Sequence, residues 1–287
     1  MKKVALVTAA AAKSLDEDLP PLLRALEKLD VRPEAVIWDD PAVDWSSYAV
    51  AVVRSTWDYV PRRDEFIAWA DRVAAQTRLS NPASILRWNT DKRYLRELEA
   101  GGASVVPTHW IEPGDPVSIP YEGAYVVKPA ISCGAKDTSR YARGDAEAAA
   151  AHVRRLQAER RTVMVQPYLE HVDQHGETGM VFLDGKYSHA IRKGAILRPD
   201  VVFVDGLYAK EELGRRDPSP AEHAVAERVL SLVPGGREQL LYARVDLAPG
   251  PGGKPVLLEL ELTEPSLFFA FSNGAEHIMA RAIARNL

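Results

Sequence analysis

The chain has 287 residues, and 46% of them are hydrophobic, which is enough to bury a core in one large domain or two to three smaller ones. A formal net charge of -4 and a pI near 6.0 exclude an overall basic field for nucleic acid or acidic membranes, so an anionic ligand must meet a local cluster of cations. The single cysteine, Cys133, allows no internal disulfide, and no apolar stretch reaches the roughly 18 residues of a membrane span. Because the N-terminus lacks a clear export signal, we expect a cytoplasmic protein without nucleic-acid or membrane partners.

The first part of the chain alternates strand and helix patterns. Strands are predicted at 4–8, 34–38 and 49–53, and helical periodicity appears at 19–29 and 62–76. This alternation is typical of a small parallel α/β layer, which ends near the turn dipeptide Asn81-Pro82. The first strand is followed by TAAAAKS rather than GxGxxG, so the sequence does not indicate a dinucleotide site.

The middle of the chain predicts a second module. A helix is expected from Thr90 to the glycine pair Gly101-Gly102, followed by a linker rich in proline and glycine at 112–123. The pattern then predicts a strand, a loop of small residues, a short strand, a helix and a strand, at 124–130, 131–137, 138–142, 145–159 and 162–169.

The last part of the chain predicts two hairpins and two helices. One hairpin covers 178–197 and turns at Asp184-Gly185, and the other covers 240–262. Helices are expected at 219–233 and from about Gly274 onward. Sheets mixed with helices throughout the chain indicate an α/β or α+β fold.

Lys128 stands where a predicted strand ends, immediately before the loop of small residues. A lysine there can reach phosphate oxygens, and the small side chains of Ser132, Cys133, Gly134 and Ala135 would let backbone N–H groups approach them closely. The pattern differs from GxxxxGK[ST], so the loop would bind phosphate as a mobile flap. The alternative is a solvent-exposed lysine at a strand end, with Cys133 as a passive small residue.

The second hairpin carries alternating charges. Arg244 and Asp246 share one face of the first strand, and Glu259 and Glu261 share one face of the second. Pairing of the strands would gather three carboxylates and a guanidinium, and oxygen ligands of this kind suit Mg²⁺. The alternative is a metal-free salt-bridge cluster centred on Arg244. The opposite face of the second strand carries leucines that can bury: Leu258, Leu260 and Leu262.

The segment RSTWDY follows the third predicted strand, at the edge where open α/β sheets place ligands. Arg54, next to Ser55, can hold a carboxylate through two hydrogen bonds, and Trp57, Asp58 and Tyr59 would shape a pocket. The alternative is a helix N-terminal cap with aromatic residues in the core. We expect this segment to contact a small substrate.

The order of these motifs resembles the ATP-grasp superfamily of carboxylate-amine ligases, in its glutathione synthetase-like branch. The resemblance spans nearly the whole chain, and its motifs are AVAVVRSTWDYV, LSNPASILRWNTDKRYL, YVVKPAISCGAKD, VMVQPYLEHVDQHGETGMVF and RVDLAPGPGGKPVLLELELTEP. It implies an ATP-grasp fold with an N-terminal parallel α/β domain, a central and C-terminal mixed-sheet domain and a mobile lid. The implied ranges are 1–84 for the first, 85–120 with 169–287 for the second, and 121–168 for the lid.

The resemblance implies ATP-binding roles for residues in several motifs. Lys92 of NTDK and Lys128 of VVKP would contact the nucleotide phosphates together with the loop residues Ser132, Cys133 and Gly134. The strand end VQPYL would present backbone groups to adenine, and the acid of HGETG would bind the ribose hydroxyls. These last residues are Gln166, Pro167, Tyr168, Leu169 and Glu177.

The family's Mg²⁺ ligands fall on Asp246, Glu259 and the second position after Glu259. That position is usually asparagine in the family and is Glu261 here. The extra carboxylate would either bind two Mg²⁺ ions more tightly or pair with Arg244 or Lys193 instead.

Three further residues complete the implied substrate site. Arg192 and Lys193 in HAIRKGA stand where the branch often has cations facing the transferred phosphate, against an alternative of exposed hairpin charges. Ser266, in ELTEPSL, is a candidate substrate contact.

The resemblance also implies the chemistry. A substrate carboxylate would attack the γ-phosphate of ATP, and an amine would displace phosphate from the resulting acyl phosphate, leaving ADP and phosphate. Lys128, Lys193 and Arg244, with Lys92, would stabilise the charge on the transferring group.

The motifs RSTWDY, NTDKRYL and ELTEPSL are similar to the small group that contains cycloserine synthetase, the O-ureidoserine cyclo-ligase. In that antibiotic-forming reaction, the carboxylate and the attacking nitrogen belong to one amino-acid-like molecule. Two alternatives stay open at this point: an intermolecular ligase of the glutathione synthetase type, and a nucleotide-binding regulatory protein without catalysis. Homodimers are common in this branch, so a homodimer is one expectation.

Overall fold

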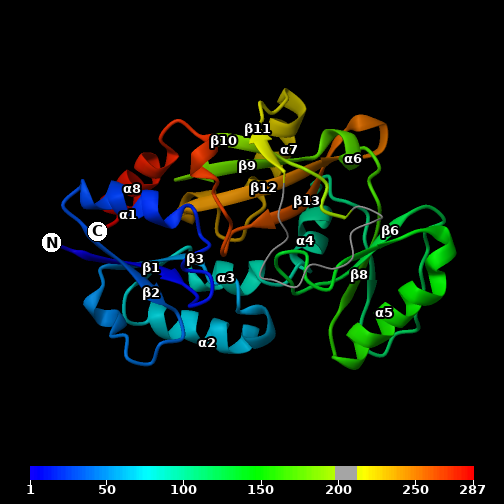
Figure 1. The fold of residues 1–287 in the computed structure, drawn as a ribbon, viewed down its shortest axis with the longest axis horizontal. Helices are drawn as coiled ribbons and strands as arrows, with labels where there is room; N and C mark the ends of the chain where they lie inside the picture. Colours follow the sequence, from blue (N-terminus) through cyan, green and yellow to red (C-terminus); the bar gives the residue numbers. More distant parts are fainter. Residues whose placement is uncertain (198–211) are drawn as a thin grey trace.

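The computed structural model describes residues 1–197 and 212–287, and its strands form three sheets (Figure 1). A parallel sheet holds the N-terminal strands, a five-stranded antiparallel sheet crosses the middle of the molecule, and a four-stranded antiparallel sheet lies at the far end. The predicted mixed α/β architecture is therefore confirmed. The domain boundaries given above stay predictions.

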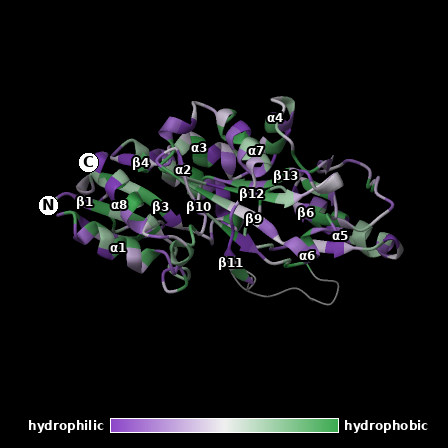
Figure 2. Cartoon of the chain, turned by 90° about the horizontal axis from the view of Figure 1, so that it is seen from above, coloured by the Kyte–Doolittle hydropathy of each residue, from purple (hydrophilic) through white to green (hydrophobic). Residues whose placement is uncertain are grey.

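The parallel sheet is covered by helices on both faces. Val4 and Val52 pack toward α1 and the C-terminal helix α8, while the alternate residues Val7 and Val53 pack toward α2. Figure 2 shows hydrophobic residues along β1, β3 and α8. The sheet order is β2 (Arg32–Ile37), β1 (Lys3–Thr8), β3 (Val50–Ser55) and β4 (Arg78–Ser80), with α1 at Leu19–Glu27, α2 at Arg63–Ala74 and α8 at Ala275–Arg285.

The five-stranded sheet has one face packed against three helices. Leu98 of α4, Val229 of α7 and Leu260 of β13 belong to one buried cluster. The strand order is β11 (Leu213–Arg215), β10 (Lys186–Lys193), β9 (Glu177–Leu183), β12 (Tyr242–Pro249) and β13 (Pro255–Glu261), and the helices are α3 (Ala83–Asn89), α4 (Tyr94–Ala100) and α7 (Pro220–Ser231).

The four-stranded sheet packs against α5 and corresponds to the predicted strand, loop, strand, helix, strand module. Val127, Val153 and Val165 lie in its buried cluster. Its order is β5 (His109–Ile111), β8 (Val163–Pro167), β6 (Tyr125–Pro129) and β7 (Ser139–Tyr141), with α5 at Ala146–Ala158 and the short α6 at Val172–His175. Within the described ranges, no helix has both the length and the apolar character needed to cross a membrane.

Both predicted hairpins are confirmed. β9 and β10 turn at Asp184 and Gly185, whose φ angles of 53° and 71° are the positive values that a tight two-residue turn requires. β12 and β13 pair so that Arg244 lies opposite Glu261 and Asp246 lies opposite Glu259. The predicted gathering of these four side chains on one face of the sheet is thus observed.

The prediction that side chains along β13 alternate strictly between the two faces of the sheet is wrong for Leu258. The register shifts next to Asp246, since Asp246 pairs with Glu259 while Leu247 pairs with Leu257. Leu258 is the extra residue of this bulge, and it is half-buried in a cavity wall instead of joining the core with Leu260.

The helix predicted from Thr90 begins at Tyr94 and is preceded by a separate helix, α3. The intervening backbone leaves the helical path because the N–H of Lys92 donates to the carbonyl of Ala130 at 2.9 Å, in the loop after β6. This contact ties the predicted phosphate-binding lysine Lys92 to the loop that follows Lys128.

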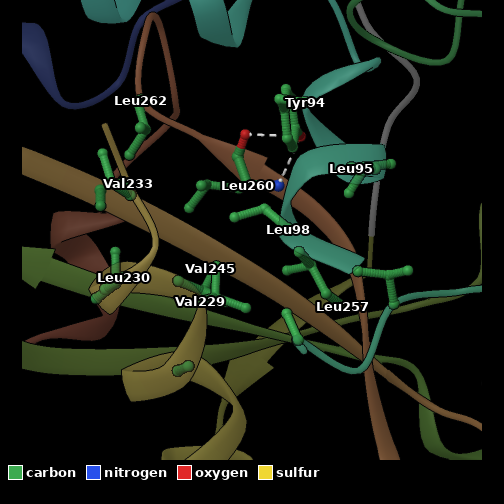
Figure 3. Packing of buried hydrophobic residues seen from close by; sticks show 14 of the residues in the cluster. Tyr94, Leu95, Leu98, Val229, Leu230, Val233, Val245, Leu257, Leu260 and Leu262 are labelled. Carbon is green, nitrogen blue, oxygen red and sulfur yellow. Dashed lines mark hydrogen bonds between the residues drawn. The ribbon is translucent and has the colours of Figure 1, made fainter. Parts of the chain in front are cut away.

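Side chains from the preceding helices satisfy the outer edge of β13. The Leu260 carbonyl accepts hydrogen bonds from Asn89 Nδ2 at 2.7 Å and from the Tyr94 hydroxyl at 2.9 Å, and its N–H donates to the same hydroxyl at 2.9 Å (Figure 3). The N–H of Leu262 donates to Asn89 Oδ1 at 2.7 Å, and its carbonyl accepts from Asn81 Nδ2 at 2.8 Å. An edge that would otherwise expose unpaired backbone groups is therefore closed by this set of polar side chains.

We predict that Tyr94→Phe lowers the free energy of unfolding by about 1–3 kcal/mol, because the buried N–H of Leu260 loses its acceptor. Tyr125→Phe is the matched control, since the buried Tyr125 hydroxyl has no hydrogen-bond partner among the described residues. This control should leave stability unchanged or raise it slightly. Urea unfolding of both variants is the measurement, and equal losses would contradict the role given to the β13 edge.

Candidate active site

A cavity of about 810 Å³ opens between the five-stranded sheet and the four-stranded sheet. β6 and β8 form one wall, β12 and β13 form the other, and the segment after β3 closes one end. The polar residues of the predicted site that line it are Lys92, Lys128, Ser132, Cys133, Gln166, Tyr168, Glu177, Lys193, Arg244, Asp246, Glu259, Glu261 and Ser266.

An ion-pair network covers the β12 side of the cavity. Arg244 Nε donates to Asp246 Oδ1 at 2.8 Å, and Lys193 Nζ donates to Asp246 Oδ2 at 3.1 Å. Lys193 also lies 3.4 Å from Glu177 Oε2, and Arg244 pairs with Glu261. Glu261 and Arg244 are thus ion-paired in the structure, and the role of Glu261 as a metal ligand stays a prediction.

The charges of this network fix the protonation of its carboxyl groups. Burial alone would raise the pKa of Asp246, but the positive charges of Arg244 and Lys193 outweigh burial and hold that pKa at about 2. Enclosure in the cavity wall raises the pKa of Glu261 to about 7 despite the nearby Arg244, and the negative charges of Asp246 and Glu259 add to this rise. The carboxyls therefore differ strongly in acidity although they share one sheet face.

The two lysines of the predicted phosphate site also differ. Burial would lower the pKa of Lys92, but Glu259, whose Oε1 lies 3.0 Å from its Nζ, raises that pKa above its usual value. Lys92 Nζ also donates to the carbonyl of Ser132 at 2.6 Å. Burial lowers the pKa of Lys128 to about 8, since the attraction of Glu259 does not offset it.

The apolar part of the cavity lies where β8 ends. Val126, Val172 and Ala248 line it together with the predicted adenine-binding residues Gln166, Pro167, Tyr168 and Leu169. The Gln166 side chain points to Thr108, with Nε2 at 2.8 Å from the Thr108 hydroxyl, so it is held by the protein. An apolar region in a cavity that also holds lysines can accept a planar base with its phosphates.

The loop of small residues has a left-handed backbone at three neighbouring positions. Gly134, Ala135 and Asp137 have φ angles of 60°, 58° and 55°. Cys133 Sγ donates to the carbonyl of Trp57 at 3.2 Å, and burial raises the pKa of its thiol to about 12. Cys133 is therefore a protonated side chain that holds the loop against the N-terminal layer, which fits the passive role expected for it.

The carboxylates predicted to bind Mg²⁺ are oxygen donors of the right kind, and Asp246 and Glu259 face each other across β12 and β13. Each is already ion-paired, however, and within residues 1–197 and 212–287 no three His, Cys, Asp or Glu side chains form a preassembled metal site. A metal ion at this donor set would therefore bind carboxylates that already contact Lys92, Lys193 or Arg244.

Comparison with known proteins decides the family. Residues 4–81 match the family model described as the N-terminal domain of D-cycloserine synthetase DcsG. The chain is 42% identical over 297 residues to the cycloserine biosynthesis protein DcsG of Streptomyces lavendulae, covering 99% of this chain and 98% of that protein. The chain belongs to the DcsG family.

Solved structures agree with this membership. The crystal structure of D-cycloserine synthetase DcsG superposes with a TM-score of 0.89 at 41% identity and covers 99% of both chains. The ATP-grasp ligase PsnB, at 18% identity, covers 99% of this chain and 97% of its own with a TM-score of 0.63. D-alanine–D-alanine ligase from Bacillus anthracis gives 0.72 at 14% identity, covering 100% and 97%. The predicted ATP-grasp fold is confirmed.

Four of the predicted substrate contacts lie outside the cavity of this DcsG-family chain. Arg54 is 1% exposed, and its NH2 group donates to the carbonyl of Pro265 at 3.1 Å. The hydroxyls of Ser55 and Thr8 lie 2.8 Å apart, and Asp58 accepts from Trp38 Nε1 at 2.9 Å. Arg54 thus contacts the loop after β13 and the Tyr242 ring, while Ser55 and Asp58 contact residues of the N-terminal layer.

Arg192 is the fourth predicted substrate contact outside the cavity. Its side chain points to the opposite face of the sheet from that of Lys193, because consecutive strand residues face opposite sides. Its Nε donates to the carbonyl of His175 at 3.0 Å, on the side of β10 away from the cavity. Lys193, in contrast, is buried in the cavity wall. Trp57 and Ser266 do line the cavity as expected.

Sequence reasoning missed several cavity residues, among them Asp18, Glu264 and Phe268. Asp18 accepts hydrogen bonds from the N–H groups of residues 267 to 269, and so holds the loop after β13 across nearly the full chain length. Glu264 belongs to the motif ELTEPSL, which was a usable signal. No sequence pattern pointed to Asp18, because the groups that it binds are backbone N–H groups, which any residue provides.

We predict that Lys128→Met raises stability by about 1–3 kcal/mol near pH 7, because a buried charge with a depressed pKa costs folding free energy. Below about pH 8 this lysine is protonated in both the folded and the unfolded state, so the cost is complete. Between about pH 8 and its usual pKa of 10.5 the folded state loses the proton first, and the advantage of the variant fades. Urea unfolding across this pH range tests the prediction.

The matched control for that series is Lys254→Met, at an exposed position in the turn between β12 and β13. It should change stability little and without a trend in pH. A gain at Lys128 that stays constant up to pH 10.5 would contradict the assigned cause.

Proposed function

We propose that this chain is an ATP-dependent ligase of cycloserine biosynthesis, which activates the carboxylate of O-ureidoserine as an acyl phosphate and then closes a C–N bond within the same molecule. The observation that carries the proposal is the cavity itself. It places Lys128, Lys193 and Arg244 beside acidic side chains and an apolar region, in a chain 42% identical to DcsG over its full length. We propose ADP and phosphate as the other products.

The cavity residues suit phosphoryl transfer because that chemistry needs alignment and charge neutralisation more than a covalent nucleophile. Lys92 and Lys128 would hold the ATP phosphates, while Lys193 and Arg244 would stabilise the charge on the γ-phosphoryl group as the substrate carboxylate attacks it. Cys133 takes no part, since its thiol is protonated and already bonded to Trp57.

The second step favours ring closure over an intermolecular reaction. The nitrogen bonded to the side-chain oxygen of O-ureidoserine attacks the acyl carbon and loses its proton, phosphate leaves, and a five-membered ring results. The ring nitrogen still carries the carbamoyl group, and water then removes that group as carbon dioxide and ammonia to leave cycloserine. Both reacting groups belong to one molecule, so no second substrate site is needed. The sheet of β5, β8, β6 and β7 covers the cavity and would exclude the water that hydrolyses acyl phosphates.

Asp246, Glu259 and Glu261 would hold Mg²⁺ through their carboxylate oxygens, and the ion would neutralise phosphate charge when bound. We also propose that the protein acts in the cytoplasm, where ATP is supplied. The homodimer stays a prediction.

We expect the purified protein to form ADP and phosphate with O-ureidoserine, ATP and Mg²⁺, and to lose this turnover when EDTA removes the metal. Mass spectrometry of the product should show a cyclised molecule derived from a single amino acid. A condensed product from two amino acids would support the intermolecular alternative. ATP binding without ADP formation across a panel of small amino acids would contradict both ligase hypotheses.

The neighbours Lys193 and Arg192 give a matched test of the site. We predict that Lys193→Met lowers kcat at least about 100-fold, because it removes a cation from the transferred phosphoryl group. Arg192→Met should change kcat less than about threefold, since its side chain faces away from the cavity. Both rates are measured below the thermal midpoint of each variant, and equal losses would contradict the assignment of Lys193.

A further inference from the structure

Glu264 lies in the cavity wall, in the loop that follows β13. Its backbone is held from two sides, because Trp57 Nε1 donates to the Glu264 carbonyl at 3.0 Å and Arg54 donates to the next carbonyl, that of Pro265, at 3.1 Å. Its side chain is hydrogen-bonded with Tyr59, which is buried and also lines the cavity. Glu264 is therefore a fixed carboxyl group that faces the ligand space.

The other buried or half-buried carboxylates of the cavity already have cations. Glu259 pairs with Lys92, and Glu261 and Asp246 pair with Arg244. The remaining two are Glu177, which pairs with Lys193, and Asp18, whose Oδ2 lies 3.8 Å from Arg54. Among the described residues, Glu264 has no ion-pair partner, although it stands in the same wall.

A carboxyl group in this position is poorly satisfied by the protein alone. Burial, together with the negative charge of Glu261, raises the pKa of Glu264 to about 8. A cationic ligand group at hydrogen-bond distance would reverse that effect, because a charge-assisted hydrogen bond favours the ionised carboxylate. Within residues 1–197 and 212–287, Glu264 is thus an acceptor without an ion-pair partner.

The place of Glu264 in the cavity fits an amino acid. The backbone carbonyl of Ser266, two residues further along the same loop, accepts a hydrogen bond from Arg244 Nη1 at 2.9 Å. This short loop therefore joins Glu264 to Arg244, which under the proposed function stabilises the reacting phosphoryl group. An amino acid carries its ammonium and carboxylate groups on one carbon. A carboxylate directed at the cations therefore brings its ammonium group to the neighbouring part of the wall.

We infer that Glu264, positioned by Tyr59 and Trp57, binds the α-ammonium group of the substrate and so selects amino acids over carboxylic acids that lack the amine. This inference rests on the proposed function, since it deepens the recognition of the same substrate. Glu264 is then a specificity-determining residue, distinct from the cations that act on the phosphoryl group. Tyr59 is a positioning residue that holds the carboxyl in place.

The test compares O-ureidoserine with 3-(ureidooxy)propanoic acid, which is the same molecule without the amine. ADP formation is measured for the wild type, Glu264→Gln and Tyr59→Phe. The wild type should prefer the amine-bearing substrate by about 30- to 1,000-fold in kcat/KM, the range expected when one partner of a buried charged contact is removed. Glu264→Gln should lose a similar factor with O-ureidoserine and change less than about threefold with the analogue.

A structural role would act on both substrates, so the ratio of the two kcat/KM values is the deciding readout. Tyr59→Phe should shift this ratio in the same direction by a smaller factor, and KM for ATP should stay unchanged in both variants. The control is Glu227→Gln on the exposed face of α7, which should keep the wild-type ratio. If Glu264→Gln does not fold, Glu264→Asp takes its place and should give an intermediate ratio.

The outcomes separate this inference from the proposed function. Turnover of both substrates without preference in the wild type would overturn the role of Glu264 but leave the ligase intact. Equal losses with both substrates in Glu264→Gln would also overturn it. Absence of ADP formation with either substrate would contradict the proposed function and this inference together.

Discussion

The outer edge of β13 is the constraint on which the site depends. This strand carries Glu259 and Glu261 and is the last strand of its sheet, and on its outer side Leu257 exchanges backbone hydrogen bonds with residues 104 and 106. Further along the same edge Asn89 and Tyr94 bond to its backbone, so the strand is clamped between β12 and two helices that come from much earlier in the chain. A one-residue slip would turn the carboxylates into the core. The clamp therefore sets which side chains face the cavity.

Charge balance is the second organising feature. The cavity holds cations for an anionic ligand, and three of them, Lys92, Lys193 and Arg244, are paired with carboxylates that line the same cavity. A ligand phosphate or metal ion that enters the cavity meets charges that are already paired, so it does not have to desolvate isolated charges. The arrangement keeps buried lysines and an arginine stable in a protein whose formal net charge is only -4.

Regular apolar patterns made much of the fold predictable. The strand and helix periods of the N-terminal layer, the turn at Asp184-Gly185 and the charged faces of β12 and β13 all follow from local sequence. The exceptions have tertiary causes. The bulge at Leu258 depends on the register with β12, and the separation of α3 from α4 depends on the contact between Lys92 and Ala130. The burial of Arg54 likewise depends on the distant loop at Pro265. Within the site, side-chain types were readable from motifs, but which face Arg192 occupies was not.

The packing of α8 against α1 affects how the protein is made. Leu22 and Leu26 of α1 share a buried cluster with Met279 and Ile283 of α8, and Figure 1 shows both chain ends side by side. On a ribosome that adds roughly 5–20 residues per second, the apolar face of α1 waits tens of seconds for its cover. The N-terminal layer therefore emerges with one face open, and that face is covered only when α8, which is synthesised much later than α1, packs against it.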